Sequence, residues 1–211
     1  MRNLPKTYIH NKPILKSYGF DRDTLLKSIL YVYKVLDAID DKLTEADTVR
    51  FSKLVELANL SAMIGNLFRS GLIRHSDGMF KENAPHAFPD LLSVDETYDD
   101  LEIKVALETN KPKGHLIKPG HHIVIRYVLG ENDGSYNRGK ENRGDVAWIW
   151  EVAIGELIEE HFSVSNTAGD SGKTAVINKA GMNNLNTVFF DPRMFPYGNK
   201  GPVKKAYSIF F

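Results

Sequence analysis

The sequence predicts an α/β (α+β) fold in which helices come first and a mixed central sheet of about five strands, flanked by helices, follows. Residues 21–71 repeat apolar side chains at helical spacing, whereas the segments after residue 88 are short and β-prone. Neither an internal repeat nor a linker divides the chain. We therefore expect one domain over residues 1–211, with a mainly helical part at 1–80 and the sheet within 85–211.

Two helices are expected in the first third of the chain. The first covers residues 21–43, where apolar side chains recur every three or four positions and Asp21 or Asp23 can cap the N-terminus. The second covers residues 47–71 and ends near Gly71, because its apolar positions continue the same period.

The strands are expected where β-branched and aromatic residues lie between turn-forming ones. The segments with this pattern are 91–94, 101–107, 121–130, 161–165, 173–180 and 185–192. Residues 145–158 form either a strand or a strand followed by a helix, and Trp148 and Trp150 are spaced to share one strand face. Residues 130–145 between them are polar and rich in glycine, which predicts a long loop.

Composition excludes several classes of function. The chain has no cysteine, so disulfides, thiolate metal sites and a cysteine nucleophile are excluded. Its N-terminus lacks the apolar core of a signal peptide, and no apolar run is long enough to span a bilayer. We therefore expect a soluble cytoplasmic protein with no membrane partner.

Charge is distributed unevenly, although 27 basic side chains balance 27 acidic ones. Residues 88–108 contain seven acids and a single base, Lys104, whereas residues 111–126 and 193–211 contain bases and no acid. An acidic centre between basic segments suits an enzyme that binds a cation and a polyanion together. A solvated surface that is neutral on average explains the same counts equally well.

The acidic segment, FPDLLSVDETYDDLEIKVALE, contains a set of residues that can support phosphodiester hydrolysis. Glu102 and Lys104 share one face of a strand, and a hairpin that pairs Leu92 with Glu102 and Asp90 with Lys104 adds a second carboxylate. Two converging carboxylates suit Mg²⁺, and a nearby lysine can orient a water and offset developing charge. The alternative is an exposed Glu–Lys pair with Asp90 capping a turn.

Pro89-Asp90 followed by Glu102-Ile103-Lys104 resembles the motif of the PD-(D/E)xK nuclease superfamily. The order of elements resembles that of a type II restriction endonuclease, because helices precede the motif and the sheet continues after it. The resemblance covers residues 48–130 by motif and the rest of the chain by general architecture.

This resemblance implies a restriction-endonuclease-like fold and a set of site residues. Asp90 and Glu102 are implied as ligands of Mg²⁺, with Mn²⁺ as a substitute, and Lys104 as the catalytic lysine. Many members add a carboxylate from a preceding helix, and Glu56 is the candidate because it is the only acid between Asp47 and Asp77. A solvated helix position explains Glu56 equally well.

Three polar segments are expected to contact DNA. Lysines in a proline-bounded loop suit phosphate contacts, arginine and asparagine suit base edges, and small polar side chains suit phosphates. The residues are Lys111, Lys113 and Lys118; Arg138, Lys140, Asn142 and Arg143; and Asn166, Ser171, Lys173 and Thr174. The last segment resembles a nucleotide-binding loop, but Thr167 stands where that loop needs a glycine.

A zinc site is not expected from the neighbouring histidines. Adjacent histidines on a strand point to opposite faces, so His121 and His122 do not easily share one ion. We expect these two and His115 to be exposed polar residues near a basic edge.

The sequence therefore favours a Mg²⁺-dependent, sequence-specific endonuclease of double-stranded DNA, a type II restriction enzyme that acts as a homodimer on a palindromic site. A repair or junction-resolving nuclease of the same superfamily is the second interpretation. A non-catalytic module that binds DNA or protein, in which Glu102 and Lys104 form a surface pair, is the third.

Overall fold

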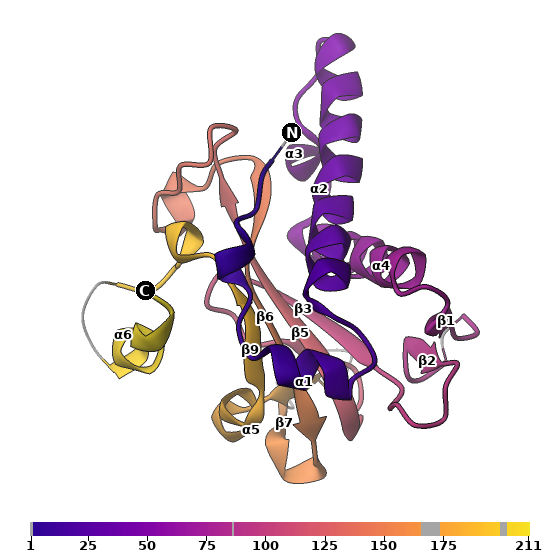
Figure 1. The fold of residues 1–211 in the computed structure, drawn as a ribbon. Helices are drawn as coiled ribbons and strands as arrows, with labels where there is room; N and C mark the ends of the chain where they lie inside the picture. Colours follow the sequence, from indigo (N-terminus) through magenta and orange to yellow (C-terminus); the bar gives the residue numbers. More distant parts are fainter. Residues whose placement is uncertain (1, 86, 166–173, 199–201) are drawn as a thin grey trace.

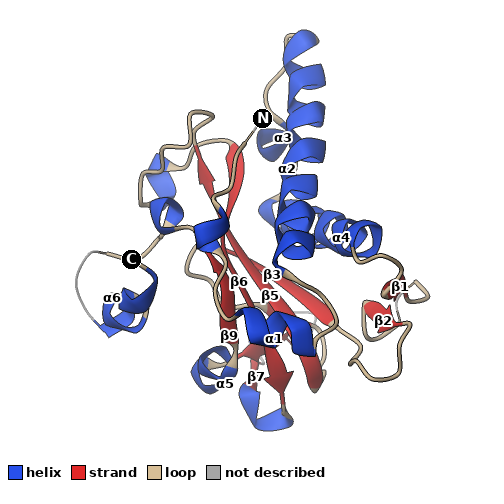
Figure 2. Cartoon of the chain, viewed as in Figure 1, coloured by secondary structure: helices blue, strands red, loops and turns tan. Residues whose placement is uncertain are grey.

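The computed structural model describes residues 2–85, 87–165, 174–198 and 202–211. Its fold is mixed α+β, as the sequence predicted. Figure 1 shows a central sheet with two long helices, α2 and α4, on one side and the C-terminal helix α6 on the other. Figure 2 shows the same view coloured by secondary structure.

The first elements of the chain are helical and the later ones are mainly strands. The α-helices are α1 (Lys12–Ser17), α2 (Arg22–Glu45), α3 (Phe51–Leu54), α4 (Leu57–His75), α5 (Lys179–Asn184) and α6 (Pro202–Ala206). The 3-10 helices are η1 (Lys6–Tyr8), η2 (Lys140–Asn142), η3 (Glu159–His161), η4 (Pro192–Met194) and η5 (Ser208–Phe210). The strands are β1 (Phe80–Glu82), β2 (Leu91–Ser93), β3 (Glu102–Leu107), β4 (Lys113–Gly114), β5 (Gly120–Gly130), β6 (Val146–Leu157), β7 (Phe162–Ser165), β8 (Thr174–Ile177) and β9 (Asn186–Phe190).

The central sheet is mixed and has the strand order β3-β5-β6-β9. Strands β3 and β5 run parallel, while the β5–β6 and β6–β9 pairs are antiparallel. This sheet has four strands where about five were expected, because β1–β2 and β4-β8-β7 form two smaller sheets among the described residues. Strands β5 and β6 are buried along almost their whole length, as expected for central strands covered on both faces.

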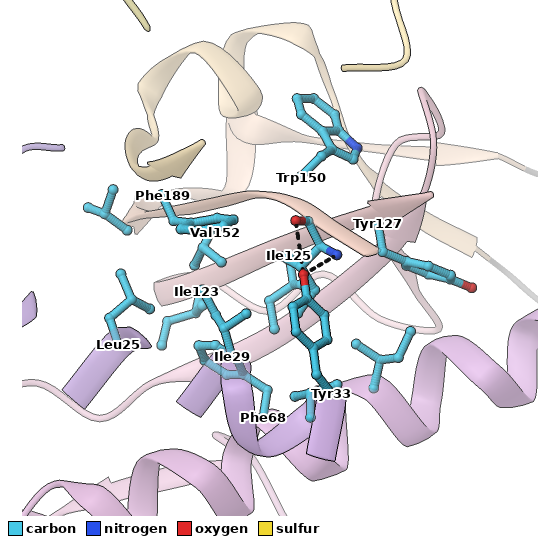
Figure 3. Packing of buried hydrophobic residues seen from close by; sticks show 14 of the residues in the cluster. Leu25, Ile29, Tyr33, Phe68, Ile123, Ile125, Tyr127, Trp150, Val152 and Phe189 are labelled. Carbon is cyan, nitrogen blue, oxygen red and sulfur yellow. Dashed lines mark hydrogen bonds between the residues drawn. The ribbon is translucent and has the colours of Figure 1, made fainter. Parts of the chain in front are cut away.

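The helices α2 and α4 cover one face of the central sheet. Asp21 caps α2 by accepting a hydrogen bond from the backbone N–H of Thr24 (2.8 Å), as the sequence predicted. The two helices approach closely at Gly71, where an added Cβ would lie 2.9 Å from the Cα of Ser28. Tyr33 of α2 reaches the sheet and accepts a hydrogen bond from the backbone N–H of Ile149 (2.9 Å; Figure 3).

The opposite face of the sheet carries a buried ion pair. Arg126 of β5 pairs with Glu151 of β6, and its guanidinium lies 4.2 Å from the ring centroid of Trp150. Tyr207 from the C-terminal segment donates to Glu151 (2.7 Å), and Arg126 donates to the hydroxyl of Tyr197 (3.1 Å). These contacts fix the C-terminal segment against the sheet.

The single second helix predicted for residues 47–71 is wrong, because two helices occupy this region. Val55 and Glu56 have extended backbone angles and separate α3 from α4. The backbone N–H of Phe51 donates to Asp40 of α2 (2.8 Å), and the Ser52 hydroxyl donates to the carbonyl of Asp145 (2.6 Å). These distant partners fix α3 separately from α4.

Trp148 and Trp150 do not share one packing environment, although their spacing predicted a common strand face. A register shift of the β5–β6 pair between Arg126 and Tyr127 interrupts the alternation of side chains. The Trp148 ring packs against Tyr33 (5.6 Å), whereas Trp150 packs against the C-terminal aromatic residues on the side away from the helices (Figure 3).

Candidate functional site

The Asp90 side chain is hydrogen-bonded to β3, and the neighbouring Leu91 pairs with Leu101 in a register different from the predicted one. Leu91 and Leu101 form an isolated antiparallel bridge, so the predicted pairing of Leu92 with Glu102 is wrong. The N–H of Ile103 donates to Oδ2 of Asp90 (2.8 Å). Strand β2 instead pairs mainly with β1, which the sequence did not predict as a strand.

Glu102 and Lys104 lie on the same side of β3, as strand alternation predicted. Lys104 Nζ donates to Oε1 of Glu102, and Lys118 Nζ donates to the same oxygen (3.0 Å). The Glu102 side chain is buried, with 1% of its surface exposed. Burial alone would raise the pKa of Glu102, but the positive charges of Lys104 and Lys118 outweigh it, so the pKa lies below its usual value.

The pKa of Asp90 is shifted in the opposite direction, above its usual value. Burial raises the pKa of Asp90, the negative charge of Glu102 raises it further, and the hydrogen bond from Ile103 only partly offsets these effects. Arg69 of α4 lies 3.9 Å from Oδ1 of Asp90 and binds Glu82 of β1 (2.8 Å). The two carboxylates therefore interact electrostatically, and the pKa of Asp90 is raised while that of Glu102 is lowered.

A cleft of about 840 Å³ begins beside Asp90 and runs along β3 and α4. Among the described residues that line it, Asp90 is the one acid, and six side chains are cationic: Arg69, Lys104, Lys111, Lys113, Lys140 and Arg143. His115 and Thr174 also line it. The arrangement brings a carboxylate and a lysine to a strongly cationic groove, which suits a polyanionic ligand.

Some predicted DNA contacts lie in this cleft and others have protein partners. Arg143 binds Glu108 through two hydrogen bonds (2.6 and 2.8 Å), although it still lines the cleft. Arg138 donates to the backbone carbonyl of Phe195 (3.2 Å), and Asn142 donates to that of Arg138 (2.8 Å). Lys118 contacts Glu102 instead of lining the cleft.

The remaining predicted contacts fall in residues 166–173. Asn166, Ser171 and Lys173 lie outside the described residues.

Glu56 does not lie beside Asp90. It is the exposed residue that precedes α4, whereas Arg69, which contacts Asp90, is thirteen residues further along. At 1.5 Å per residue this separation is about 20 Å along the helix. The carboxylate that the structure brings toward Asp90 through Arg69 is Glu82.

His122 was expected to be exposed, and this expectation is wrong. His121 and His122 do point to opposite faces: His121 meets Tyr18 (3.0 Å), and the ring of His122 lies 6.0 Å from that of Phe162. His122 is fully buried, and burial lowers its pKa to about 4. Its place in an otherwise apolar strand is the sequence feature that could have indicated burial.

Arg69 was also missed, because nothing in the local sequence of α4 distinguishes it from other exposed helix positions. Its role follows from the packing of α4 against β1 and β3, which brings it to both Glu82 and Asp90.

The chain as a whole matches no protein-family profile and no curated protein sequence. In the described part of the chain, no group of three or more His, Cys, Asp or Glu side chains is arranged to hold a metal ion. None of the described helices combines the length and the apolar character needed to cross a membrane.

Proposed function

We propose that this protein is a Mg²⁺-dependent DNA endonuclease of the PD-(D/E)xK type, with a restriction-endonuclease-like fold. One observation carries the proposal. Asp90 is hydrogen-bonded to the strand that presents Glu102 and Lys104, and this group adjoins a cleft with six cationic side chains. A lone surface ion pair does not explain the burial of Glu102 or the second lysine that binds it.

Two carboxylates support a cation site in spite of the small number of ligands. Oε2 of Glu102 is buried and has no hydrogen-bond partner among the described residues, so it is available to a ligand. Oxygen ligands from two carboxylates suit Mg²⁺, which usually keeps several waters and binds substrate phosphate. When bound, this ion would polarise a phosphoryl oxygen and acidify a water.

The protein residues would perform the remaining steps. Lys118 and Lys104 keep Glu102 ionised at neutral pH, and the Ile103 N–H fixes the orientation of Asp90. Lys104 borders the cleft, so its ammonium can orient a water near phosphorus and offset the negative charge that develops there.

The cleft would hold the DNA backbone. Lys111, Lys113 and Lys140 are exposed and line the groove, so they can neutralise phosphates. Cleavage of both strands at a palindromic site requires two copies of the site, and we therefore propose that the active form is a homodimer.

The test is incubation of the purified protein with Mg²⁺ and a panel of unmodified linear duplexes, mismatched duplexes and four-way junctions. Discrete fragments from the linear duplexes, absent with EDTA, support a restriction enzyme. Cleavage confined to mismatched or branched substrates would favour a repair or resolving nuclease. A protein that retards DNA but releases no ends on any substrate would contradict nuclease activity altogether.

A further inference from the structure

Two residues that are direct partners across the β3–β5 pair each have a buried polar atom without a hydrogen-bond partner in the described part of the chain. These atoms are Oε2 of Glu102 and Nε2 of His122, and only Nε1 of Trp150 shares this condition among the described side chains. Glu102 is 1% exposed and His122 is 0% exposed. A buried polar atom without a partner costs about 1–3 kcal/mol, so two such atoms together indicate a ligand that satisfies both.

The strand register puts the two side chains on the same face of the sheet. Glu102 of β3 and His122 of β5 are direct partners in the parallel pair, and neighbouring strands lie about 4.8 Å apart. Side chains at paired positions of parallel strands point the same way. Phe162 of β7 covers His122 on this face, with ring centroids 6.0 Å apart.

Hydrogen bonding defines what each free atom can do. Nδ1 of His122 lies 2.9 Å from the carbonyl oxygen of Gly120, which can only accept, so Nδ1 carries the proton and Nε2 presents a lone pair. The donors that reach Glu102, from Lys104 and Lys118, both bind Oε1. Two lone-pair atoms cannot bond each other and need a shared cation or donor.

We propose that Nε2 of His122 and Oε2 of Glu102 are two ligands of one divalent cation of the class that accepts nitrogen, such as Mn²⁺, Co²⁺ or Zn²⁺. No three His, Asp or Glu side chains of the described residues are already arranged around one point, so Asp90, the other ligand in the proposed function, and oxygens of water and substrate would complete the shell. Imidazole nitrogen binds Zn²⁺ and Co²⁺ in preference to Mg²⁺, whose ligands are oxygens, and Mn²⁺ is the weakest binder of the three. This inference deepens the proposed function and rests on it for the role of the ion, but ion binding is measurable without DNA.

The test uses Mn²⁺ alone with the full-length protein. Free Mn²⁺ is titrated by electron paramagnetic resonance for the wild type, His122→Asn and His121→Asn. The asparagine amide can still donate to the carbonyl of Gly120, so His122→Asn removes chiefly the Nε2 ligand. His121 is the matched control because it lies on the opposite face and contacts Tyr18.

We expect His122→Asn to weaken Mn²⁺ binding at least tenfold, about the minimum loss that even outer-shell changes cause. The Mn²⁺ affinity of the H121N control should stay within about twofold of that of the wild type, because His121 lies away from the proposed ion. Pulsed resonance on the wild type should show coupling of Mn²⁺ to an imidazole nitrogen. This measurement decides the question if the H122N variant fails to fold.

Absence of nitrogen coupling in the wild type, or equal Mn²⁺ affinity of the folded H122N variant, would overturn the inference and leave a bridging water as the explanation. DNA cleavage in Mg²⁺ alongside that result would leave the proposed function intact. If H122N weakens Mn²⁺ binding but the wild type never cuts DNA, the ion site stands and the proposed nuclease function is contradicted.

Discussion

Replacement of Lys104 by methionine tests the role of the lysine in the proposed chemistry. Methionine keeps an unbranched side chain of similar length and removes the ammonium that donates to Glu102. Loss of one group that stabilises developing charge typically lowers the rate by about 10²–10³, or roughly 3–4 kcal/mol of barrier. We therefore expect single-turnover cleavage at saturating DNA to fall by this factor.

The same substitution should leave DNA binding almost unchanged and should lower the stability of the fold moderately. Five cationic side chains remain around the cleft, so the DNA affinity of Lys104→Met should stay within a few fold of the wild type. Glu102 keeps its hydrogen bond from Lys118 (3.0 Å) and loses one charge-assisted bond. That loss corresponds to about 1.5–3 kcal/mol of unfolding free energy.

Lys113→Met is the matched control, because Lys113 lines the same cleft, is exposed and lies in β4. Loss of the Lys113 ammonium should weaken DNA binding and reduce the salt dependence of the DNA affinity by about one phosphate contact. The cleavage rate at saturating DNA should be unchanged. Fluorescence anisotropy in EDTA measures binding, and rapid-quench electrophoresis measures cleavage. A wild-type cleavage rate in K104M, or an equal loss of saturated rate in K113M, would show that the Lys104 ammonium has no special part in cleavage.

Three further predictions concern stability and are measurable by urea unfolding. Arg126→Met removes a buried guanidinium and should lower the free energy of unfolding by about 3–5 kcal/mol. Arg22→Met removes a partly exposed guanidinium and should lower it by less than about 1 kcal/mol; similar losses would contradict a buried ion pair. Burial lowers the pKa of His122 to about 4, so between pH 7 and pH 5 the imidazole takes up a proton in the unfolded state, near pH 6.5, but not in the folded state. In EDTA, the free energy of unfolding of the wild type should therefore fall by about 2 kcal/mol more than that of H122N over this pH range. Equal losses would show that His122 titrates normally. The methyl group added in Gly71→Ala would contact the backbone of α2, so the free energy of unfolding should fall by about 1–3 kcal/mol. In Gly65→Ala the added methyl first contacts a side-chain methyl, so the fall should be smaller.

Features set by local alternation were predictable from the sequence. The side shared by Glu102 and Lys104 follows from their spacing in a strand, and the Asp21 cap follows from residue type. The opposite directions of His121 and His122 also follow from strand alternation. These features depend only on neighbours within a few residues.

Features that depend on distant partners were not predictable. His122 is buried beside Phe162, forty residues later in the chain, and α3 is fixed by Asp40 and by the carbonyl of Asp145. The register that brings Asp90 to β3 depends on the pairing of Leu91 with a residue ten positions away. No periodicity within a short window contains this information.

Asp90 and Glu102 are proposed to act together with a divalent cation to cut DNA. The rate at which an unmethylated plasmid is cleaved, titrated with Mg²⁺, tests this role in the wild type and in Asp90→Asn. We expect saturable cleavage by the wild type and a rate at least about 10²-fold lower for D90N at similar DNA affinity. An intact plasmid at every Mg²⁺ concentration, or equal cleavage by D90N, would show that Asp90 and Glu102 do not form a nuclease site.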